Sequence, residues 1–292
     1  MDLPRILLFG RIGQVGWELR RALAPMAELS CLDFPEIDFT QPDSIRQAIA
    51  QARPQVVINA AAYTAVDKAE SEPAKAAQIN GEAPGVMAEA AKQAGALLVH
   101  YSTDYVFDGA KSGPYLETDT PNPHSAYGRS KLAGDLAVQA VAGPHLIFRL
   151  CWVYGARGQN FLLTIMRLAR ERECLRVVED QVGAPTPCRL IAQATALALR
   201  QVLAAREPGP LCGLYHLAAG GATSWHGFAT AIVDLMPAEG RKCRRVEPIS
   251  TPQYPTPARR PANSLMSCAK LEGTFGLRLP PWEDALRLVM ES

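Results

Sequence analysis

Tyr127 and Lys131 form a Tyr-x-x-x-Lys pair, in which a phenol and an ammonium group are four residues apart. On a helix this spacing puts both side chains on one face, one turn apart. A cation so close to a phenol favours the phenolate and lowers the pKa of the tyrosine. Such a tyrosine can exchange a proton with a carbonyl oxygen near neutral pH. The same spacing also occurs on ordinary helix surfaces, so the rest of the chain must decide its meaning.

A glycine-rich turn near the N-terminus is the second feature that points to chemistry. An apolar run over residues 5–9 predicts a strand, and glycines at 10, 13 and 16 lead into an amphipathic stretch over 17–24. Glycines so placed let backbone amides approach a pyrophosphate at a helix N-terminus, where the helix dipole favours anions. The spacing is Gly-x-x-Gly-x-x-Gly, and its position between strand and helix gives it weight. The expected pyrophosphate contacts are Gly10, Gly13, Gln14, Val15 and Gly16.

The next apolar run, over residues 29–32, ends at Asp33. A carboxylate there can accept hydrogen bonds from an adenosine ribose and repels a 2′-phosphate, which favours NADH. Arg11 in the glycine turn has the opposite effect, so NADH and NADPH both stay open as the coenzyme. Asp38 and Phe39 are expected to hold the edge and face of the adenine, although such a pair is also common as a turn residue and a core anchor.

The composition is that of an ordinary globular protein. The chain has 292 residues, 48% of them hydrophobic, which suffices for a sizeable core. A formal net charge of +1 gives no electrostatic footprint for nucleic acid. No apolar run approaches the roughly 18 residues of a membrane span, and no signal-peptide pattern precedes the first strand. Scattered cysteines and histidines predict neither a disulfide framework nor a metal site. We therefore expect a cytoplasmic protein without nucleic-acid or membrane partners.

Short apolar runs alternate with helical stretches through the first half of the chain. This alternation is typical of α/β proteins with a doubly wound parallel sheet of the Rossmann type. Pro84 and Gly85 predict two helices or a kink within residues 73–95. Beyond about residue 155 the pattern loosens. This change predicts a dinucleotide-binding domain over residues 1–155 and a smaller, mainly substrate-binding domain over residues 156–292. The two domains could also be interleaved along the chain.

Small and polar side chains follow the third and fourth predicted strands, whose carboxyl ends are where a doubly wound fold binds ligands. Thr103 and Asp104 end the fourth strand. The Thr103 hydroxyl can hydrogen-bond a substrate carbonyl and polarise it together with Tyr127. After the third strand, small side chains would let a nicotinamide ribose lie close to the backbone. The residues expected there are Ala61, Ala62, Tyr63 and Thr64.

Together, the glycine turn, the Asn-Ala-Ala-Ala segment at 59–62, Ser102-Thr103 and the Tyr-Lys pair resemble the extended short-chain dehydrogenase/reductases. Within that superfamily the resemblance narrows to the dTDP-4-dehydrorhamnose reductase family. The segments that carry it are spread over nearly the whole chain, at residues 13–19, 59–70, 101–107, 152–154, 180–186 and 260–264.

The resemblance implies NAD(P)H-dependent reduction of the 4-keto group of dTDP-4-dehydro-6-deoxy-L-mannose, which gives dTDP-L-rhamnose. It implies that Tyr127 donates a proton to the keto oxygen and that Thr103 polarises the carbonyl. It also implies that Lys131 stabilises the phenolate and binds the nicotinamide ribose. Asp104 and Trp152 match positions that contact the sugar, where an indole supplies an apolar wall with an N–H donor.

The C-terminal segment over residues 254–264 resembles the nucleotide-sugar loop of that family. Arg260 would bind the diphosphate through two parallel hydrogen bonds, and prolines would stiffen the loop that presents it. Asn263 is the second substrate contact expected in this loop. A proline-rich surface loop with solvated arginines is the alternative interpretation.

The chain departs from the family pattern at one point. Some members are dimers bridged by magnesium through glutamates, and Glu18 fits one such position, but Arg189 stands where another glutamate is expected. A cation there would repel magnesium, so a metal-bridged dimer is not expected, while a homodimer stays open.

Two other functions also stay open for this sequence. One is another nucleotide-sugar 4-ketoreductase or epimerase, and the other is a non-catalytic regulatory subunit, which has this fold in methionine adenosyltransferase.

Overall fold

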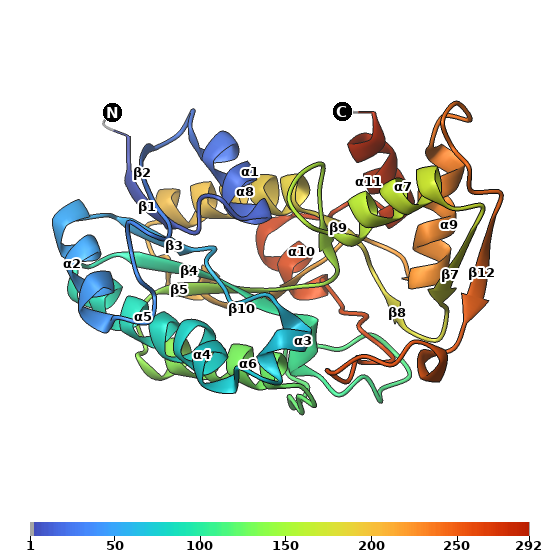
Figure 1. Cartoon of the computed structure of the whole chain (residues 1–292). Helices are drawn as coiled ribbons and strands as arrows, with labels where there is room; N and C mark the ends of the chain where they lie inside the picture. Colours follow the sequence, from blue (N-terminus) through green and yellow to red (C-terminus); the bar gives the residue numbers. More distant parts are fainter. Residues whose placement is uncertain (1–2, 292) are drawn as a thin grey trace.

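A six-stranded parallel sheet organises the protein (Figure 1). The computed structural model describes residues 3–291. The strand order is β10–β5–β4–β3–β1–β2, and every neighbouring pair is parallel. The chain changes direction across the sheet between β1 and β3, the kind of point at which doubly wound folds bind ligands. The doubly wound sheet predicted from the sequence is therefore confirmed. Its strands are β1 (Arg5–Phe9), β2 (Glu28–Leu32), β3 (Val56–Asn59), β4 (Leu97–Thr103), β5 (His145–Leu150) and β10 (Gly213–Leu217).

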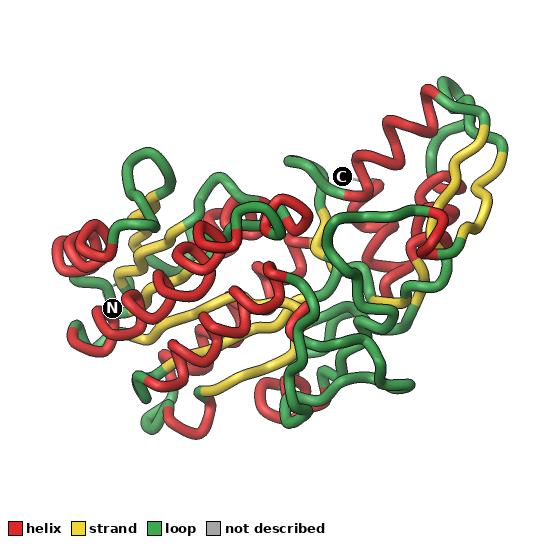
Figure 2. The backbone as a smooth tube through the Cα atoms, turned by 60° about the horizontal axis from the view of Figure 1, so that its bottom comes forward, coloured by secondary structure: helices red, strands yellow, loops and turns green. Residues whose placement is uncertain are grey.

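The sheet has a hydrophobic core on each face. Ile6 and Leu8 of β1 belong to the core that includes side chains of α1, α8 and α10, whereas Leu7 and Phe9 belong to the core with α2, α5 and α6. Because successive strand residues point to opposite faces, a strand covered on both faces is apolar throughout. Figure 2 shows the helices on both sides of the sheet. They are α1 (Gln14–Leu23), α2 (Pro42–Ala52), α5 (Ala83–Gln93), α6 (Ala126–Ala140), α8 (Cys188–Ala204) and α10 (Ala269–Phe275).

The later half of the chain contributes to this sheet and also builds a separate core. Strand β10 pairs with β5, and α8 packs against α1. The separate core lies at the other end of the molecule (Figure 1) and joins three helices to a parallel strand pair. These elements are α7 (Phe161–Glu171), α9 (Trp225–Leu235), α11 (Trp282–Met290), β7 (Cys174–Val178) and β12 (Arg245–Ile249). The domain division near residue 155 stays a prediction.

Two short strand pairs lie between the sheet and that core. Strand β6 (Val153–Tyr154) pairs with β9 (Thr186–Pro187), and β8 (Val182–Gly183) pairs with β11 (Thr223–Ser224). The described part of the chain, residues 3–291, contains no helix with the length and hydropathy of a membrane span.

The helical stretch over 73–95 has an unexpected middle. Helix α4 (Pro73–Ala77) passes through a π-helical turn (Gln78–Glu82) into α5. Pro84, which has no backbone N–H to donate, lies in the first turn of α5 just after the π turn. The irregularity is therefore the π turn before the proline. A short helix, α3 (Val66–Ala69), precedes this stretch.

Candidate active site

The first turn of α6 is fixed by capping contacts. The Ser125 side chain accepts a hydrogen bond from the Gly128 amide at 3.0 Å, and Glu70 accepts one from the Ala126 amide at 2.7 Å. Such caps satisfy amides that have no partner within the helix. A Cβ at Gly128 would collide with the Tyr105 carbonyl, so the helix can approach the segment after β4 only with glycine there. This turn carries Tyr127.

Lys131 lies one turn further along α6 and is buried. Its Nζ donates a hydrogen bond to the Tyr101 carbonyl oxygen of β4 at 2.6 Å. Burial lowers the pKa of Lys131 from 10.5 to about 8, and the nearby charge of Asp135 opposes that shift. The group therefore keeps its positive charge near neutral pH, with two further N–H donors for other partners.

Tyr127 is half-buried, and burial raises its pKa above the ordinary value of 10. A hydrogen bond with the Thr103 side chain opposes this increase. The prediction that Lys131 lowers the pKa of Tyr127 is therefore wrong in direction for this structure, because desolvation outweighs the favourable contacts. A phenol that retains its proton is nevertheless the form that can donate to a carbonyl oxygen.

Thr103 and Asp104 are buried next to Tyr127 at the end of β4. The Thr103 hydroxyl donates to Asp104 Oδ1 at 3.0 Å and accepts from the Tyr105 amide at 3.2 Å. Burial raises the pKa of Asp104 to about 6, although the neighbouring Ser264 and Thr103 side chains oppose the increase. Asp104 Oδ2 is buried and has no hydrogen-bond partner among residues 3–291. The structure thus brings Thr103 to Tyr127 but directs its proton to Asp104, so rotation must precede donation to a substrate.

The glycine turn packs tightly against the end of β3. Gly10 has φ of +84°, and a Cβ there would collide with the backbone of Ala61. A Cβ at Gly16 would collide with the Gly10 carbonyl, while Gly13 precedes the first residue of α1. The turn is therefore as compact as a pyrophosphate site requires, and it ends at a helix N-terminus. A dinucleotide fits this arrangement.

The side chains of Gln14 and Val15, between Gly13 and Gly16, contact other parts of the protein. Gln14 Oε1 accepts a hydrogen bond from Asn160 Nδ2 at 2.8 Å, which ties the glycine turn to the later half of the chain. Val15 packs against the core that lies between the sheet and helices α1, α8 and α10. Their part in cofactor binding stays a prediction.

Asp33 lies beside the glycine turn, because its Oδ2 accepts the Ile12 amide at 2.9 Å. Asp38 and Phe39 have local partners instead. Asp38 Oδ1 accepts from both the amide and the hydroxyl of Thr40, and the Phe39 ring meets Phe9 edge-on at 5.8 Å. These contacts fit the alternative in which Asp38 is a turn residue and Phe39 anchors the core. The adenine role of Asp38 and Phe39 therefore stays a prediction without support from these contacts.

Asn80 is a site residue that the sequence did not reveal. From the π turn it pairs with the Tyr63 backbone, accepting the amide at 2.8 Å and donating to the carbonyl at 3.0 Å. It also donates to Ser130 Oγ of α6 at 3.0 Å. Asn80 thus ties the expected nicotinamide segment, whose Ala62 is half-buried and whose Thr64 is exposed, to the helix that carries Tyr127. Hydrophobic periodicity gives no sign of a π turn, so this contact could not be foreseen.

The C-terminal loop reaches the same site through Arg260. Its guanidinium donates to Asp67 Oδ2 at 2.7 Å and to the Tyr105 hydroxyl at 3.1 Å. The Tyr105 ring in turn meets the Tyr127 ring edge-on at 5.6 Å. Asn263 is used differently, because its Nδ2 donates to the carbonyl oxygens of Lys111 and Gly113. Arg260 is therefore linked to Tyr127 through Tyr105, while the Asn263 amide group holds a neighbouring loop.

Trp152 adopts a left-handed backbone, with φ of +43°, two residues after the end of β5. Such a conformation is costly for a bulky residue and needs support from its surroundings. Its indole stacks on Trp225 at 3.5 Å between ring centroids, and a Cβ at Gly183 would collide with the Trp152 ring. Trp225 and Gly183 thus support Trp152. Gly183 belongs to the segment over residues 180–186 that carries the family resemblance, but no feature of the sequence points to Trp225.

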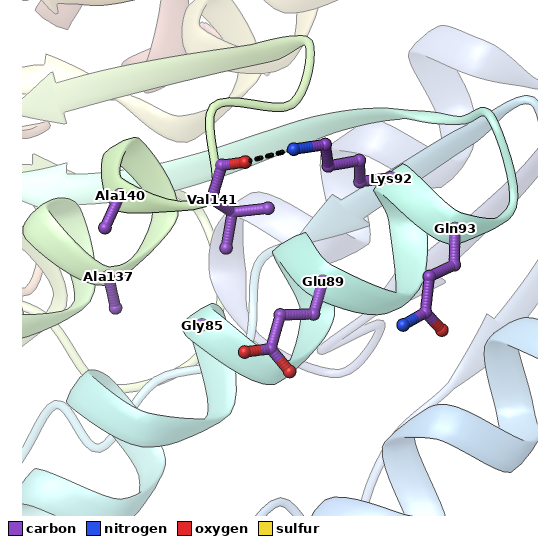
Figure 3. Close-up of a pocket in the computed structure, with 7 residues that line it drawn as sticks. All are labelled: Gly85, Glu89, Lys92, Gln93, Ala137, Ala140 and Val141. Carbon is purple, nitrogen blue, oxygen red and sulfur yellow. Dashed lines mark hydrogen bonds between the residues drawn. The ribbon is translucent and has the colours of Figure 1, made fainter.

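A surface groove between α5 and α6 lies apart from this site (Figure 3). Across it, Lys92 donates to the Val141 carbonyl oxygen at 2.7 Å. Those of its residues that belong to α6 come from the later turns of that helix, whereas Tyr127 is in the first turn. Within residues 3–291 no group of three or more His, Cys, Asp or Glu side chains could hold a metal ion, and Glu18 faces Arg189 at 3.6 Å.

Comparisons with known proteins identify the family of this chain. The family model described as the RmlD substrate binding domain matches residues 4–292. The dTDP-4-dehydrorhamnose reductase of Burkholderia thailandensis is 51% identical over 289 residues, which are 97% of each chain. A crystal structure of a dTDP-4-dehydrorhamnose reductase from Clostridium acetobutylicum has a TM-score of 0.90 at 36% identity and covers 98% of each chain. That of Bacillus anthracis, in complex with NADP, has a TM-score of 0.89 at 33% identity over 100% of both chains. This chain belongs to the dTDP-4-dehydrorhamnose reductase family.

Proposed function

We propose that this protein reduces the 4-keto group of dTDP-4-dehydro-6-deoxy-L-mannose to give dTDP-L-rhamnose, with Tyr127 as the proton donor. The observation that carries the proposal is the convergence of Tyr127, Lys131 and Thr103 at the end of β4. Arg260 meets them from the far end of the chain through Tyr105. Membership of the family supports the substrate and the use of a nicotinamide coenzyme.

The reduced nicotinamide, when bound, supplies the hydride that reaches the keto carbon. Tyr127 donates its proton to the keto oxygen, so that one hydride and one proton convert C=O into CH–OH. The raised pKa of Tyr127 keeps this proton on the phenol until a negative charge develops on the substrate oxygen. Lys131 then stabilises the phenolate by its positive charge and can donate to a ribose hydroxyl. Thr103 polarises the carbonyl once its hydroxyl turns from Asp104.

The remaining residues have proposed binding roles. Asp33 accepts from the adenosine ribose, and Arg260 holds the diphosphate of the sugar nucleotide while Asp67 orients its guanidinium. Trp152 and Asp104 contact the sugar. The pyrophosphate contacts are Gly10, Gly13, Gln14, Val15 and Gly16, the nicotinamide end contacts are Ala61, Ala62, Tyr63 and Thr64, and Asn263 ties the substrate loop to the segment at Lys111 and Gly113.

A coupled assay tests this function. Purified protein receives enzymatically generated dTDP-4-dehydrorhamnose with NADH or NADPH, and the loss of reduced-nicotinamide absorbance gives the rate. We expect turnover that Tyr127→Phe lowers roughly 100-fold, the scale of a lost general acid, while dinucleotide binding persists. Tyr215→Phe is the matched control, because it removes a phenol hydroxyl of β10 that donates to the Leu211 carbonyl oxygen, away from the site.

The same assay separates the other functions. Turnover of the UDP-linked ketosugar in place of the dTDP-linked one would identify a different nucleotide-sugar reductase. Dinucleotide binding without turnover of either sugar would refute the reductase proposal and favour a regulatory subunit. A Tyr127→Phe variant as active as the wild type would remove Tyr127 from the mechanism.

A further inference from the structure

We infer that Glu36 makes this protein prefer NADH over NADPH, because it pairs with Arg11, the cation of the glycine turn that could otherwise bind a 2′-phosphate. The inference rests on the proposed function only in requiring that the glycine turn bind a nicotinamide dinucleotide. The sequence left the coenzyme open, since Asp33 and Arg11 have opposite effects. The geometry of a third residue decides between them.

Arg11 is the only cation in the glycine turn over residues 10–16. Its Nη2 contacts Glu36 Oε1 at 2.6 Å, and its Nη1 donates to the Cys31 carbonyl oxygen at 2.9 Å. Both terminal nitrogens of the guanidinium therefore face protein acceptors. The Glu36 carboxylate thus offsets the positive charge with which Arg11 would attract a 2′-phosphate.

Glu36 is itself held in the orientation that captures Arg11. Its second carboxylate oxygen, Oε2, accepts the Asp33 amide at 3.3 Å, so the two oxygens of Glu36 bridge the end of β2 and the glycine turn. Hydrogen bonding to Arg11 lowers the pKa of Glu36, which keeps the carboxylate ionised at neutral pH. The ion pair is partly exposed, with 31% of the Arg11 side chain and 43% of the Glu36 side chain accessible, so it is open to salt and to substitution.

Asp33 supplies the selectivity that remains once Arg11 is paired. Its Oδ2 accepts the Ile12 amide of the glycine turn, and its Oδ1 accepts the Phe34 amide at 2.8 Å. Each oxygen keeps a lone pair that a ribose hydroxyl can use. A 2′-phosphate, by contrast, would meet the carboxylates of Asp33 and Glu36, while the nearest cation of the glycine turn, Arg11, is paired with Glu36. This pair of carboxylates accepts a ribose diol and disfavours a phosphate.

Titration calorimetry of NADH and NADPH against the full-length protein tests the inference without any sugar substrate. The wild type should bind NADH more tightly. Glu36→Gln should lower the Kd of NADPH about tenfold, the scale of one charge-assisted hydrogen bond that Arg11 becomes free to make. The Kd of NADH should stay within about twofold, since NADH has no 2′-phosphate and exposed ion pairs contribute little by themselves.

Two further variants make the result specific. Arg11→Ala in the Glu36→Gln background should abolish the gain for NADPH, because Arg11 is its proposed source. Glu171→Gln removes a comparable carboxylate, paired with Arg167 at 2.9 Å on α7, and should change neither Kd.

The possible outcomes are distinguishable. Tighter binding of NADPH by the wild type, or an unchanged ratio of the two Kd values in Glu36→Gln, would refute the role of Glu36 and leave the reductase proposal intact. If the protein binds neither NADH nor NADPH, both the proposed function and this inference are refuted.

Discussion

Lys131→Met should stabilise the protein while removing its activity. Burial lowers the pKa of Lys131 from 10.5 to about 8, and each pKa unit corresponds to about 1.4 kcal/mol, so holding this charge in the folded protein costs about 3 kcal/mol. Methionine fills a similar volume without the charge. The Tyr101 carbonyl loses its partner, which costs about 1 kcal/mol. The variant should therefore gain about 2 kcal/mol in the free energy of unfolding at pH 7.

The gain should depend on pH with a definite sign. The folded pKa of Lys131 is the lower one, so between pH 8 and 10.5 the unfolded chain holds a proton that the folded protein has released. The free energy of unfolding of the wild type then rises with pH relative to that of the variant, by about 2 to 3 kcal/mol by pH 10. The stability gap between the two proteins should accordingly narrow to near zero.

Urea denaturation of both proteins at several values from pH 7 to pH 10 measures this gap. Lys75→Met, at an exposed lysine of α4, is the control and should shift stability by less than about 0.5 kcal/mol at every pH. A gap that stays constant over this range, or a variant less stable than the wild type at pH 7, would show that Lys131 does not bear a desolvation cost. Cofactor binding by the variant should weaken as well, since the same ammonium is proposed to hold the ribose.

Two predictions concern the substrate side. Arg260→Lys should raise the KM for the nucleotide sugar about tenfold with kcat nearly unchanged, because lysine cannot replace the planar fork; a drop confined to kcat in steady-state kinetics would contradict a binding role. Burial raises the pKa of Asp104 from 3.8 to about 6, so the folded protein binds a proton that the unfolded chain has released between these values, and stability falls as pH rises through them. Asp104→Asn should therefore match the wild type in thermal unfolding near pH 4 and exceed it by roughly 2 kcal/mol near pH 7.5, and equal stability at both values would contradict the raised pKa.

Local patterns predicted the elements that position the site. The apolar run at β1 and the glycines at 10, 13 and 16 needed only their immediate neighbours in sequence, and the structure has them as strand, turn and helix. The spacing of Tyr127 and Lys131 likewise fixed a common face of α6. Periodicity and turn chemistry act over a few residues, so these features could be read directly.

Features that depend on contacts between distant residues could not be read. The direction of the pKa shift of Tyr127 follows from burial by surrounding elements, which spacing does not encode. The pairing of Arg11 with Glu36 depends on the path of the chain after β2, and the stacking of Trp152 on Trp225 joins residues 73 positions apart. The π turn that presents Asn80 has no sequence signature of the kind that predicts ordinary helices.

The position of β10 at the edge of the main sheet has a consequence for synthesis of the chain. Strand β5 ends at Leu150, but its neighbour β10 is complete only at Leu217, 67 residues later, and α8 lies between them. At roughly 5–20 residues per second, the ribosome takes about 3 to 13 s to add this segment. During that time the nascent chain carries an unpaired edge of β5 and an apolar face, including Ile6 and Leu8, that α8 does not yet cover. Chaperone binding to ribosome-attached chains should therefore peak after β5 has emerged from the ribosome and fall once β10 has emerged.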